Sequence, residues 1–277
     1  LYFYKQNDKG NFTQESEQFL DGIDIGNESI PAAADIDADG DIDLLMANKI
    51  DPGGRKSSIV YEFENSGTKE DPSLHQTGTL SLPNAYHYAP ALGDLTGNGL
   101  PDLLLGTWKG RIAFYRNIGD GFEKVDESFV ELERGSNSTP ALADIDNDGD
   151  LDLFIGESGG KIHFYRNEGT SQNPNFILDK GSFTDIEVGH RSTPTFYDID
   201  GDSDLDLFVG SKNEGLVFYR NIGSANKATF EKEPLPISVK APQLAAPQFV
   251  DFDGNGFADL ISGGRGGGLV YYHWISQ

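Results

Sequence analysis

Short apolar runs recur along this chain at intervals of about fifty residues, and a strongly acidic stretch precedes each one. The runs at residues 44–46, 103–105, 153–155 and 207–209 contain only Leu, Ile, Val, Phe and Met, and three of them are followed directly by Gly. Runs this short, bounded by turn residues, are typical of buried strands rather than helices. We therefore expect each acidic stretch to connect two β-strands.

A second apolar segment, Phe-Tyr-Arg-Asn, begins twelve residues beyond the last Asp of three acidic stretches, at residues 114–117, 164–167 and 218–221. Glycines between the two apolar segments indicate a hairpin turn, so this segment is the third strand of each repeat. A polar, more variable stretch can form a fourth. Four antiparallel strands in a repeat of about fifty residues predict the blade of a β-propeller.

The two ends of the chain are out of phase with the repeats. Residues 1–6 resemble a third strand and residues 11–25 can serve as a fourth, while residues 268–274 are again a third strand. Either the ring closes with residues 11–25 as the outer strand of its last blade, or the full-length protein has six or seven blades. We expect the larger ring, because a complete ring would not need two third strands at its seam.

The sequence therefore predicts an all-β fold with five full repeats and a leading half-blade. We expect a single propeller domain over residues 1–277. Its predicted parts are a half-blade at 1–28, blades at 29–84, 85–136, 137–189 and 190–243, and a final blade at 244–277 that lacks its outer strand.

The acidic stretches have the composition of calcium loops. In the nine-residue run 144–152 every odd position is an Asp, and Gly149 at position 6 permits a tight reversal of the backbone. Positions 1, 3, 5 and 9 offer side-chain oxygens and position 7 a backbone carbonyl, which suits Ca²⁺ with its six to eight oxygen ligands at about 2.3–2.6 Å. Five copies share this spacing, with a Pro four residues before each and a Leu directly after each. A solvated acidic turn would explain one copy, not five.

An EF-hand loop also begins with this pattern, but it closes with Glu at position 12 between two helices. Position 12 is Met, Leu, Ile, Val or Ser in the five copies, so we exclude the EF-hand. The predicted metal ligands, loop by loop, are Asp35, Asp37, Asp39, Asp41 and Asp43; Asp94, Thr96, Asn98, Leu100 and Asp102; Asp144, Asp146, Asp148, Asp150 and Asp152; Asp198, Asp200, Asp202, Asp204 and Asp206; and Asp251, Asp253, Asn255, Phe257 and Asp259.

The loops differ in charge. Thr96 and Asn98 replace carboxylates in the second loop, Asn255 replaces one in the fifth, and Ser203 replaces the Gly of the fourth. Because the number of charged ligands tunes calcium affinity, we expect about five Ca²⁺ ions, one in each loop, with the second loop binding most weakly.

The charge balance narrows the partners and the location. The formal net charge is −24, and 17 of the 45 acidic side chains occupy positions 1, 3, 5 and 9 of the loops. Five bound Ca²⁺ ions would reduce this charge to about −14, which still disfavours nucleic acid and anionic membranes. We expect no nucleic-acid binding and no membrane insertion. Calcium loops of modest affinity fill where calcium is abundant, so we expect a secreted or cell-surface protein, extracellular or periplasmic.

The pattern Pro-x₃-Asp-x-Asp-x-Asp-Gly-Asp-x-Asp-Leu, followed by spaced glycines and Phe-Tyr-Arg-Asn, resembles the FG-GAP/VCBS repeats of integrin-α-like calcium-binding β-propellers. The resemblance covers residues 1–274. It implies that the acidic loops join the first and second strands on one face, and that ligands bind on the opposite face.

That opposite face would consist of the segments leading into each Pro and the turns between second and third strands. Aromatic and Arg side chains at such tips favour a rim that binds sugar or protein, although they can also simply cover blade edges. The candidate ligand-binding residues are Tyr86, His87, Tyr88, Trp108, Arg134, His190, Arg191 and Arg265, and Lys109, Glu157 and Lys212 lie on the same turns.

Catalytic patterns do not stand out. The chain has five His residues but no Cys, and no spacing typical of a catalytic triad or a His/Glu centre. Phe-Tyr-Arg-Asn recurs around the ring and is interpreted as scaffold, with Arg pairing across blades. We therefore expect a calcium-binding extracellular module for binding or adhesion that is not an enzyme, with a protein or glycan as its partner. The alternatives are a lectin-like carbohydrate-binding propeller and a propeller-type polysaccharide lyase.

Overall fold

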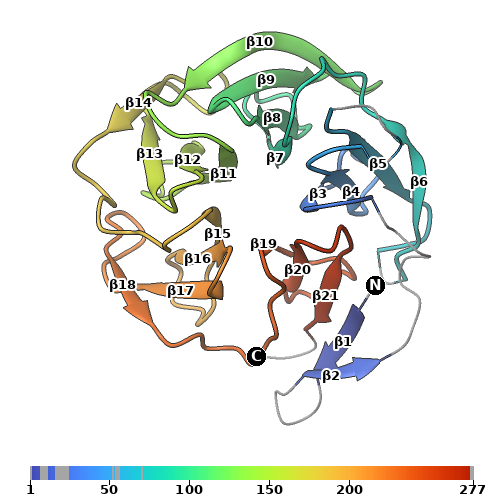
Figure 1. Ribbon diagram of the computed structural model, residues 1–277. Coiled ribbons are helices and arrows are strands. Elements are labelled where there is room, and N and C mark those ends of the chain that lie inside the picture. The colour runs from blue at the N-terminus through green and yellow to red at the C-terminus, as the bar shows by residue number, and fades with distance from the viewer. Residues whose placement is uncertain are drawn as a thin grey trace.

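The computed structural model describes residues 2–6, 12–15, 25–51, 53, 57–69 and 71–274, and every regular element in these ranges is a β-strand. The strands form five sheets arranged as a ring around a central axis (Figure 1). The predicted all-β propeller of antiparallel blades is confirmed.

Four of the blades contain four antiparallel strands in chain order. They are β3 (Ile30–Ala34), β4 (Asp43–Ala47), β5 (Val60–Asn65) and β6 (Leu74–Thr79); β7 (Ala89–Gly93), β8 (Asp102–Gly106), β9 (Arg111–Asn117) and β10 (Phe122–Glu131); β11 (Thr139–Ala143), β12 (Asp152–Gly156), β13 (Ile162–Asn167) and β14 (Phe176–Asp179); and β15 (Thr193–Tyr197), β16 (Asp206–Ser211), β17 (Gly215–Asn221) and β18 (Phe230–Glu233). The first strand of each blade lies nearest the axis (Figure 1). Each acidic loop connects a first strand to a second strand, as the sequence predicts.

The fifth sheet is composed of both ends of the described chain. Its order is β19 (Ala246–Val250), β20 (Asp259–Gly263), β21 (Val270–His273), β1 (Tyr2–Gln6) and β2 (Phe12–Glu15). Strand β1 pairs with β21 in parallel, and β2 then pairs with β1 in antiparallel orientation. Strand β1 therefore takes the fourth position, and β2, which falls within the predicted outer strand at 11–25, is the outermost strand of a five-stranded sheet. Residues 11 and 16–24 of that segment lie outside the described residues.

The ring closes with five blades, because β3 of the first blade packs against β19 and β20 of the last. The expectation of six or seven blades is therefore wrong for this ring. That expectation assumes that two third strands cannot belong to the blade in which the two ends of the chain meet. The structure accommodates both, since the free edge of β21 in the last blade accepts β1 as an added strand.

The hydrophobic core is divided among the interfaces between neighbouring blades. Five clusters of buried side chains each draw residues from two successive blades, and one of them joins the last blade to the first through Phe252, Ile261 and Tyr271 against Leu44 and Met46. Each blade therefore supplies half of two cores. The apolar second strands, buried along their whole length, form the centre of these layers.

Glycines permit the close approach of neighbouring blades. A Cβ on Gly263, at the end of β20, would lie 2.1 Å from the carbonyl oxygen of Ser29 in the first blade, and the same clash would occur at Gly106, Gly156 and Gly210. The Gly at or next to the end of the second strand in these four blades is therefore required by the packing of blades as well as by the hairpin.

Candidate metal loops and the opposite face

The first Asp of each loop fixes the backbone of its own loop. The carboxylate of Asp144 accepts hydrogen bonds from the backbone N–H groups of Asp148 and Gly149, both at 3.1 Å. The first loop makes the same two bonds at the same distances. The loop conformation is thus held by the protein itself.

Position 6 has a left-handed backbone in all five loops. The φ angles of the four glycines there are 100°, 85°, 93° and 89°, and that of Ser203 is 74°. A Cβ added to Gly149 would meet no atom within 4 Å, so backbone conformation alone selects glycine. A residue with a Cβ pays about 1–2 kcal/mol for this conformation, and the fourth loop carries that strain.

The last Asp of each loop is buried and joins the loop to the third strand. Asp152 is 2% exposed, and its Oδ1 atom accepts a hydrogen bond from the backbone N–H of Asn167 at 2.7 Å. Equivalent bonds in the other four loops span 2.7–3.0 Å. The side-chain oxygen of Asn167 in turn accepts from the backbone N–H groups of Gly169 and Asn175, at 3.0 and 2.9 Å. The Asn of Phe-Tyr-Arg-Asn therefore connects the loop, the third strand and the turn that follows.

Carboxylate oxygens converge in the first, third and fourth loops. In each of these loops three carboxylates place oxygens within 4.8 Å of one another: Asp35, Asp37 and Asp39; Asp144, Asp146 and Asp148; and Asp198, Asp200 and Asp206. Buried oxygens in the same loops accept no hydrogen bond, namely those of Asp41, Asp146, Asp150, Asp152 and Asp204. Buried acceptors without donors, crowded by like charges, fit the oxygen ligands of a hard cation.

Position 7 offers a carboxylate as well as a backbone carbonyl in these three loops. Burial, and then repulsion by Asp148 and the other loop carboxylates, raises the pKa of Asp150. Burial followed by Asp202 likewise raises the pKa of Asp204 to about 6. From the sequence, only the backbone carbonyl of position 7 is expected to act as a ligand. The available signal was that position 7 is Asp in the three most acidic loops but Leu or Phe in the other two.

Burial also raises the pKa of the position 9 carboxyl in the first, third and fifth loops. Burial raises the pKa of Asp152 to about 7 although the hydrogen bond from Asn167 opposes the shift. Burial raises the pKa of Asp259 to about 7 and that of Asp43 to about 6. A bound cation would favour the ionised forms.

In the third, fourth and fifth loops the carboxylate at position 3 pairs with a side chain on the third strand of the same blade. Arg166 donates a hydrogen bond to Asp146, and Arg220 donates to Asp200. In the fifth loop His273 occupies the place of the Arg, with its Nε2 atom 2.7 Å from Oδ2 of Asp253. The expectation that the Arg pairs across blades is wrong, because β13 and β17 lie beside their own loops and the position 3 carboxylates are within reach.

The second loop is satisfied largely by the protein. Asp94 accepts hydrogen bonds from the backbone N–H groups of Thr96 and Gly97, at 3.2 and 2.7 Å. The Thr96 hydroxyl donates to Asp102 at 3.1 Å. Asn98 donates to the Asn117 carbonyl at 2.9 Å. These donors hold the loop at positions where the first, third and fourth loops have carboxylates.

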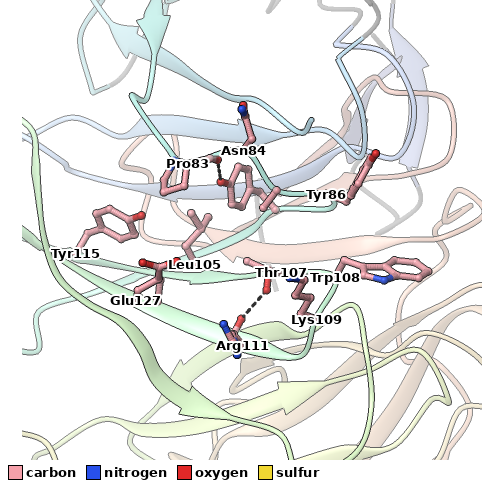
Figure 2. Close-up of a pocket in the computed structure, with 13 residues that line it drawn as sticks. Pro83, Asn84, Tyr86, Leu105, Thr107, Trp108, Lys109, Arg111, Tyr115 and Glu127 are labelled. Carbon is pink, nitrogen blue, oxygen red and sulfur yellow. Dashed lines mark hydrogen bonds between the residues drawn. The ribbon is translucent and has the colours of Figure 1, made fainter. Parts of the chain in front are cut away.

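The opposite face contains a hollow of about 310 Å³ at the second blade, beside the segment that leads into it from the first. Figure 2 shows Tyr86 and Trp108 at one end of it and Tyr115 and Glu127 at the other. Trp108 is 49% exposed and Tyr86 is 42% exposed. Lys109, Arg111, Glu127 and Asn84 add polar groups to the lining. Large exposed aromatic side chains beside such groups can contact an amphipathic ligand.

A second hollow of about 440 Å³ opens on the same face at the mouth of the axis. Its lining includes four cations, Lys49, Arg191, Lys212 and Arg265, and one carboxylate, Glu28. Lys49 lies 2.6 Å from Glu28, and Arg191 forms an ion pair with the same carboxylate. Burial opposes the ionisation of Glu28, but hydrogen bonds from Lys49 and Arg191 outweigh it and hold its pKa below the usual value.

Comparison with known families decides the relationship. The FG-GAP-like repeat profile matches residues 35–105, 94–155, 144–209 and 198–262, which together span most of the chain. The chain belongs to the FG-GAP-like repeat family. No curated protein matches it.

Each FG-GAP-like match begins at the first Asp of one loop and runs through the apolar strand after the next, so the family's repeat spans two neighbouring blades. In the described residues, no helix has the length and apolarity of a membrane span.

The FG-GAP-like fold places five of the eight predicted ligand-binding residues in the lining of the two hollows. Tyr86, Tyr88 and Trp108 line the first hollow, and Arg191 and Arg265 line the second. His87 lines neither, but it accepts a hydrogen bond from Arg191. Arg134 and His190 are exposed and line neither.

Glu28 and Lys49, which also line the axial hollow, are not among the residues predicted from the sequence. Glu28 stands three residues before the Pro of its repeat, as do His87 and Arg191 in theirs. Comparing this position across the repeats would have singled it out, because the repeats differ there.

Proposed function

We propose that this protein is an extracellular, calcium-binding β-propeller that acts as a non-catalytic binding module. One observation carries the proposal: exposed Tyr86 and Trp108 flank an apolar hollow on the face opposite the acidic loops. Aromatic anchors in a pocket with a polar surround are the usual centre of a binding site. Membership of the FG-GAP-like family supports a role in binding or adhesion.

Calcium has a structural role in this proposal. Convergent carboxylates with unbonded buried oxygens support Ca²⁺ in the first, third and fourth loops most strongly. These ions would neutralise charge on one face and leave the other face free for a partner. An extracellular location supplies calcium at the concentration that such loops need.

The test of the binding role uses Trp108→Ala in calcium-containing buffer. Labelled wild-type protein and the variant are applied to intact cell surfaces, before and after protease treatment. We expect the wild type to bind, protease to abolish binding, and the variant to bind at least about tenfold more weakly, as expected for an aromatic hot spot. Ile118→Ala, which removes an exposed apolar side chain outside the hollow, is the matched control. Equal binding by the Trp108 variant would contradict the proposed site.

A lectin-like role is the second candidate, and the concavity of the Trp108 hollow favours it. A sugar ring stacks on an aromatic face while its hydroxyls bond to groups such as Arg111 and Glu127. A glycan array probed with calcium-loaded protein tests this candidate directly. Binding to defined glycans that Trp108→Ala loses would support it, and binding to cells that survives removal of surface glycans would favour a protein partner. Incubation with acidic polysaccharides should release no unsaturated products; their release would identify a lyase instead.

A further inference from the structure

One position breaks the repetition of the ring. It lies three residues before the Pro of each repeat and is occupied by Glu28, His87, Asn137, Arg191 and Leu244. All five have a left-handed backbone, with φ between 54° and 59°. A conformation that costs about 1 kcal/mol or more for a residue with a Cβ persists only where the surroundings impose it. The fold therefore places one side chain from each blade near the axis, at the same backbone position in each.

Backbone hydrogen bonds impose this arrangement. The N–H of Asn137 donates to the carbonyl of Trp108 at 3.1 Å, and the N–H of Arg191 donates to the carbonyl of Ser158 at 3.1 Å. The N–H of Glu28 likewise donates to the carbonyl of Arg265, and the N–H of His87 donates to the carbonyl of Lys49. The residues of the axial collar are Glu28, His87, Asn137, Arg191 and Leu244, the four acceptors Lys49, Trp108, Ser158 and Arg265, and Lys212, which lines the same hollow. The same main-chain bond occurs at four of the five positions, while the side chains there are free to differ.

The collar concentrates positive charge in a strongly acidic protein. Its charged members are Lys49, Arg191, Lys212, Arg265 and Glu28, so the axial hollow carries a net charge of +3 in a chain of net charge −24. If these cations served only to pair with Glu28, one or two of them would be enough. Four cations around one cavity repel each other, and a bound anion removes that cost.

Arg191 is held in place by two acceptors. It pairs with Glu28 and donates a hydrogen bond to Nε2 of His87, which is 1% exposed. Burial, and then the charge of Arg191, lowers the pKa of His87 to about 3, so the imidazole is a neutral acceptor. Arg191 is thereby oriented by His87 without being neutralised by it.

Lys212 and Arg265 are the uncommitted cations of the collar. Among the described residues, the guanidinium group of Arg265 donates to the neutral side-chain amide of Gln243, at 3.3 Å, and to no carboxylate. Within the described part of the chain no carboxylate lies within ion-pair distance of either side chain. Both are exposed at the rim, so a ligand can reach them without disturbing the fold.

From this arrangement we propose that the axial hollow binds a small organic dianion, a dicarboxylate of a few carbon atoms. A cavity of about 440 Å³ exceeds the size of a single inorganic anion and lies in the range of small-molecule sites. Two carboxylates can meet Arg191 at the floor and Lys212 with Arg265 at the rim, and planar guanidinium groups match carboxylates in two-bond geometry. The described residues contain no helix whose N-terminus could cradle a phosphate.

The test is calorimetric titration of succinate into calcium-saturated protein at low ionic strength. Succinate chelates calcium weakly and so leaves the loops loaded. The neutral variant Lys212→Gln/Arg265→Gln should lose affinity by about tenfold or more, as expected for two charged hydrogen bonds. Lys212→Arg/Arg265→Lys keeps both charges and should bind within about twofold of the wild type. Arg116→Gln/Lys124→Gln removes two exposed cations far from the axis and should also bind normally.

Absence of succinate binding by the wild type would overturn the proposal, as would equal weakening in the Arg116/Lys124 control, which would mean an effect of overall charge. Two further ligands test the chemical class. Sulfate that binds as tightly as succinate would indicate an unspecific anion site, and glucuronate that binds more tightly would indicate an acidic sugar; either result contradicts a dicarboxylate site. Trp108→Ala keeps the main-chain carbonyl that bonds Asn137 and removes only a side chain that lines the other hollow. This variant should therefore retain succinate binding, which separates this test from that of the proposed partner-binding function.

Discussion

The side chain of Gln248 exchanges two hydrogen bonds with the backbone of Ala33. The Ala33 N–H donates to Oε1 at 2.8 Å, and Nε2 donates to the Ala33 carbonyl at 2.9 Å. Gln248 lies in β19 of the last blade and Ala33 in β3 of the first, so these bonds join strands that only ring closure brings together. A Pro precedes this position in all five repeats, and the residue after it is Ala or Thr in the other four.

Gln248→Leu should therefore weaken the seam of the ring. The change leaves a backbone N–H and C=O without partners, and we expect a loss of about 1–3 kcal/mol in unfolding free energy. Denaturant unfolding in calcium measures it. Gln76→Leu, on the exposed outer strand β6, is the matched control and should change stability by less than about 0.5 kcal/mol. Equal stability of the two variants would contradict the role of Gln248.

Removal of calcium should lower the melting temperature. Each loop crowds carboxylates that repel one another, and a ligand that binds only the folded state stabilises it, by about 2.7 kcal/mol for a site at a hundred times its Kd. Scanning calorimetry in chelator and after calcium is restored checks this. A melting temperature that chelator leaves unchanged would exclude a structural role for the ion.

In chelator, stability should fall as pH rises. The pKa of Asp152 and that of Asp259 are raised to about 7, and the pKa of Asp43 and that of Asp204 to about 6, all first by burial. A carboxyl whose pKa is higher in the folded protein than in the unfolded chain stabilises the fold at low pH, and this contribution is lost as pH rises through the folded pKa. We expect the melting temperature to decrease between about pH 5 and pH 8. Calcium should reverse this trend, since it binds the ionised loops; a chelated protein that becomes more stable over this interval would refute the assignment.

Ser203→Gly should stabilise the fourth loop. Ser203 has a φ of 74° at a position where four loops have Gly, and its exposed side chain is not needed for the bond from its N–H to Asp198 at 2.9 Å. Relief of the left-handed strain, less the entropy that Gly adds to the unfolded chain, should give about 0.5–1 kcal/mol. Thermal unfolding of this variant, of Ser203→Ala and of Gly149→Ser provides the comparison. Ser203→Ala should bring no gain and Gly149→Ser a comparable loss; a stabilising Gly149→Ser would contradict the strain.

The loops should differ in calcium affinity. Counting position 7, the first, third and fourth loops have five carboxylates, the fifth has three and the second two. Ligand charge is one determinant of calcium affinity, so calorimetric titration should resolve tight sites that Asp144→Ala reduces by one, whereas Asp94→Ala should affect only the weakest phase. Loss of the tightest phase in Asp94→Ala would show that loop rigidity, with Pro101 fixing the backbone, outweighs charge.

Much of the blade was predictable because it depends on local patterns. Alternation of carboxylates with Gly at position 6 determines the loop, and the apolar runs after it can only be buried strands. The pairing of β1 with β21 was not predictable, since nothing in residues 2–6 distinguishes a third strand of a missing blade from a fourth strand added to the last one. That choice depends on a free strand edge, which exists only in the assembled ring.

The axial hollow was predicted only in part for a similar reason. Arg191 and Arg265 were candidates on residue type, but 74 residues separate them and only the ring brings them to one cavity. Glu28 and Lys49 were not predicted, because an isolated acidic or basic residue in a loop is ordinarily a solvated surface residue. The position 7 carboxylates escaped because the interpretation of the loop assigned that position to the main chain.

The axial collar also bears on how such a protein can change over evolutionary time. Its backbone is held by main-chain bonds that do not depend on which side chain follows, as between Asn137 and Trp108. Substitutions in the collar can therefore alter ligand preference while the loops, the cores and the seam stay intact. Five different residue types occupy the same left-handed backbone position in the five repeats, so exchanging a few collar residues offers a direct route to engineered specificity.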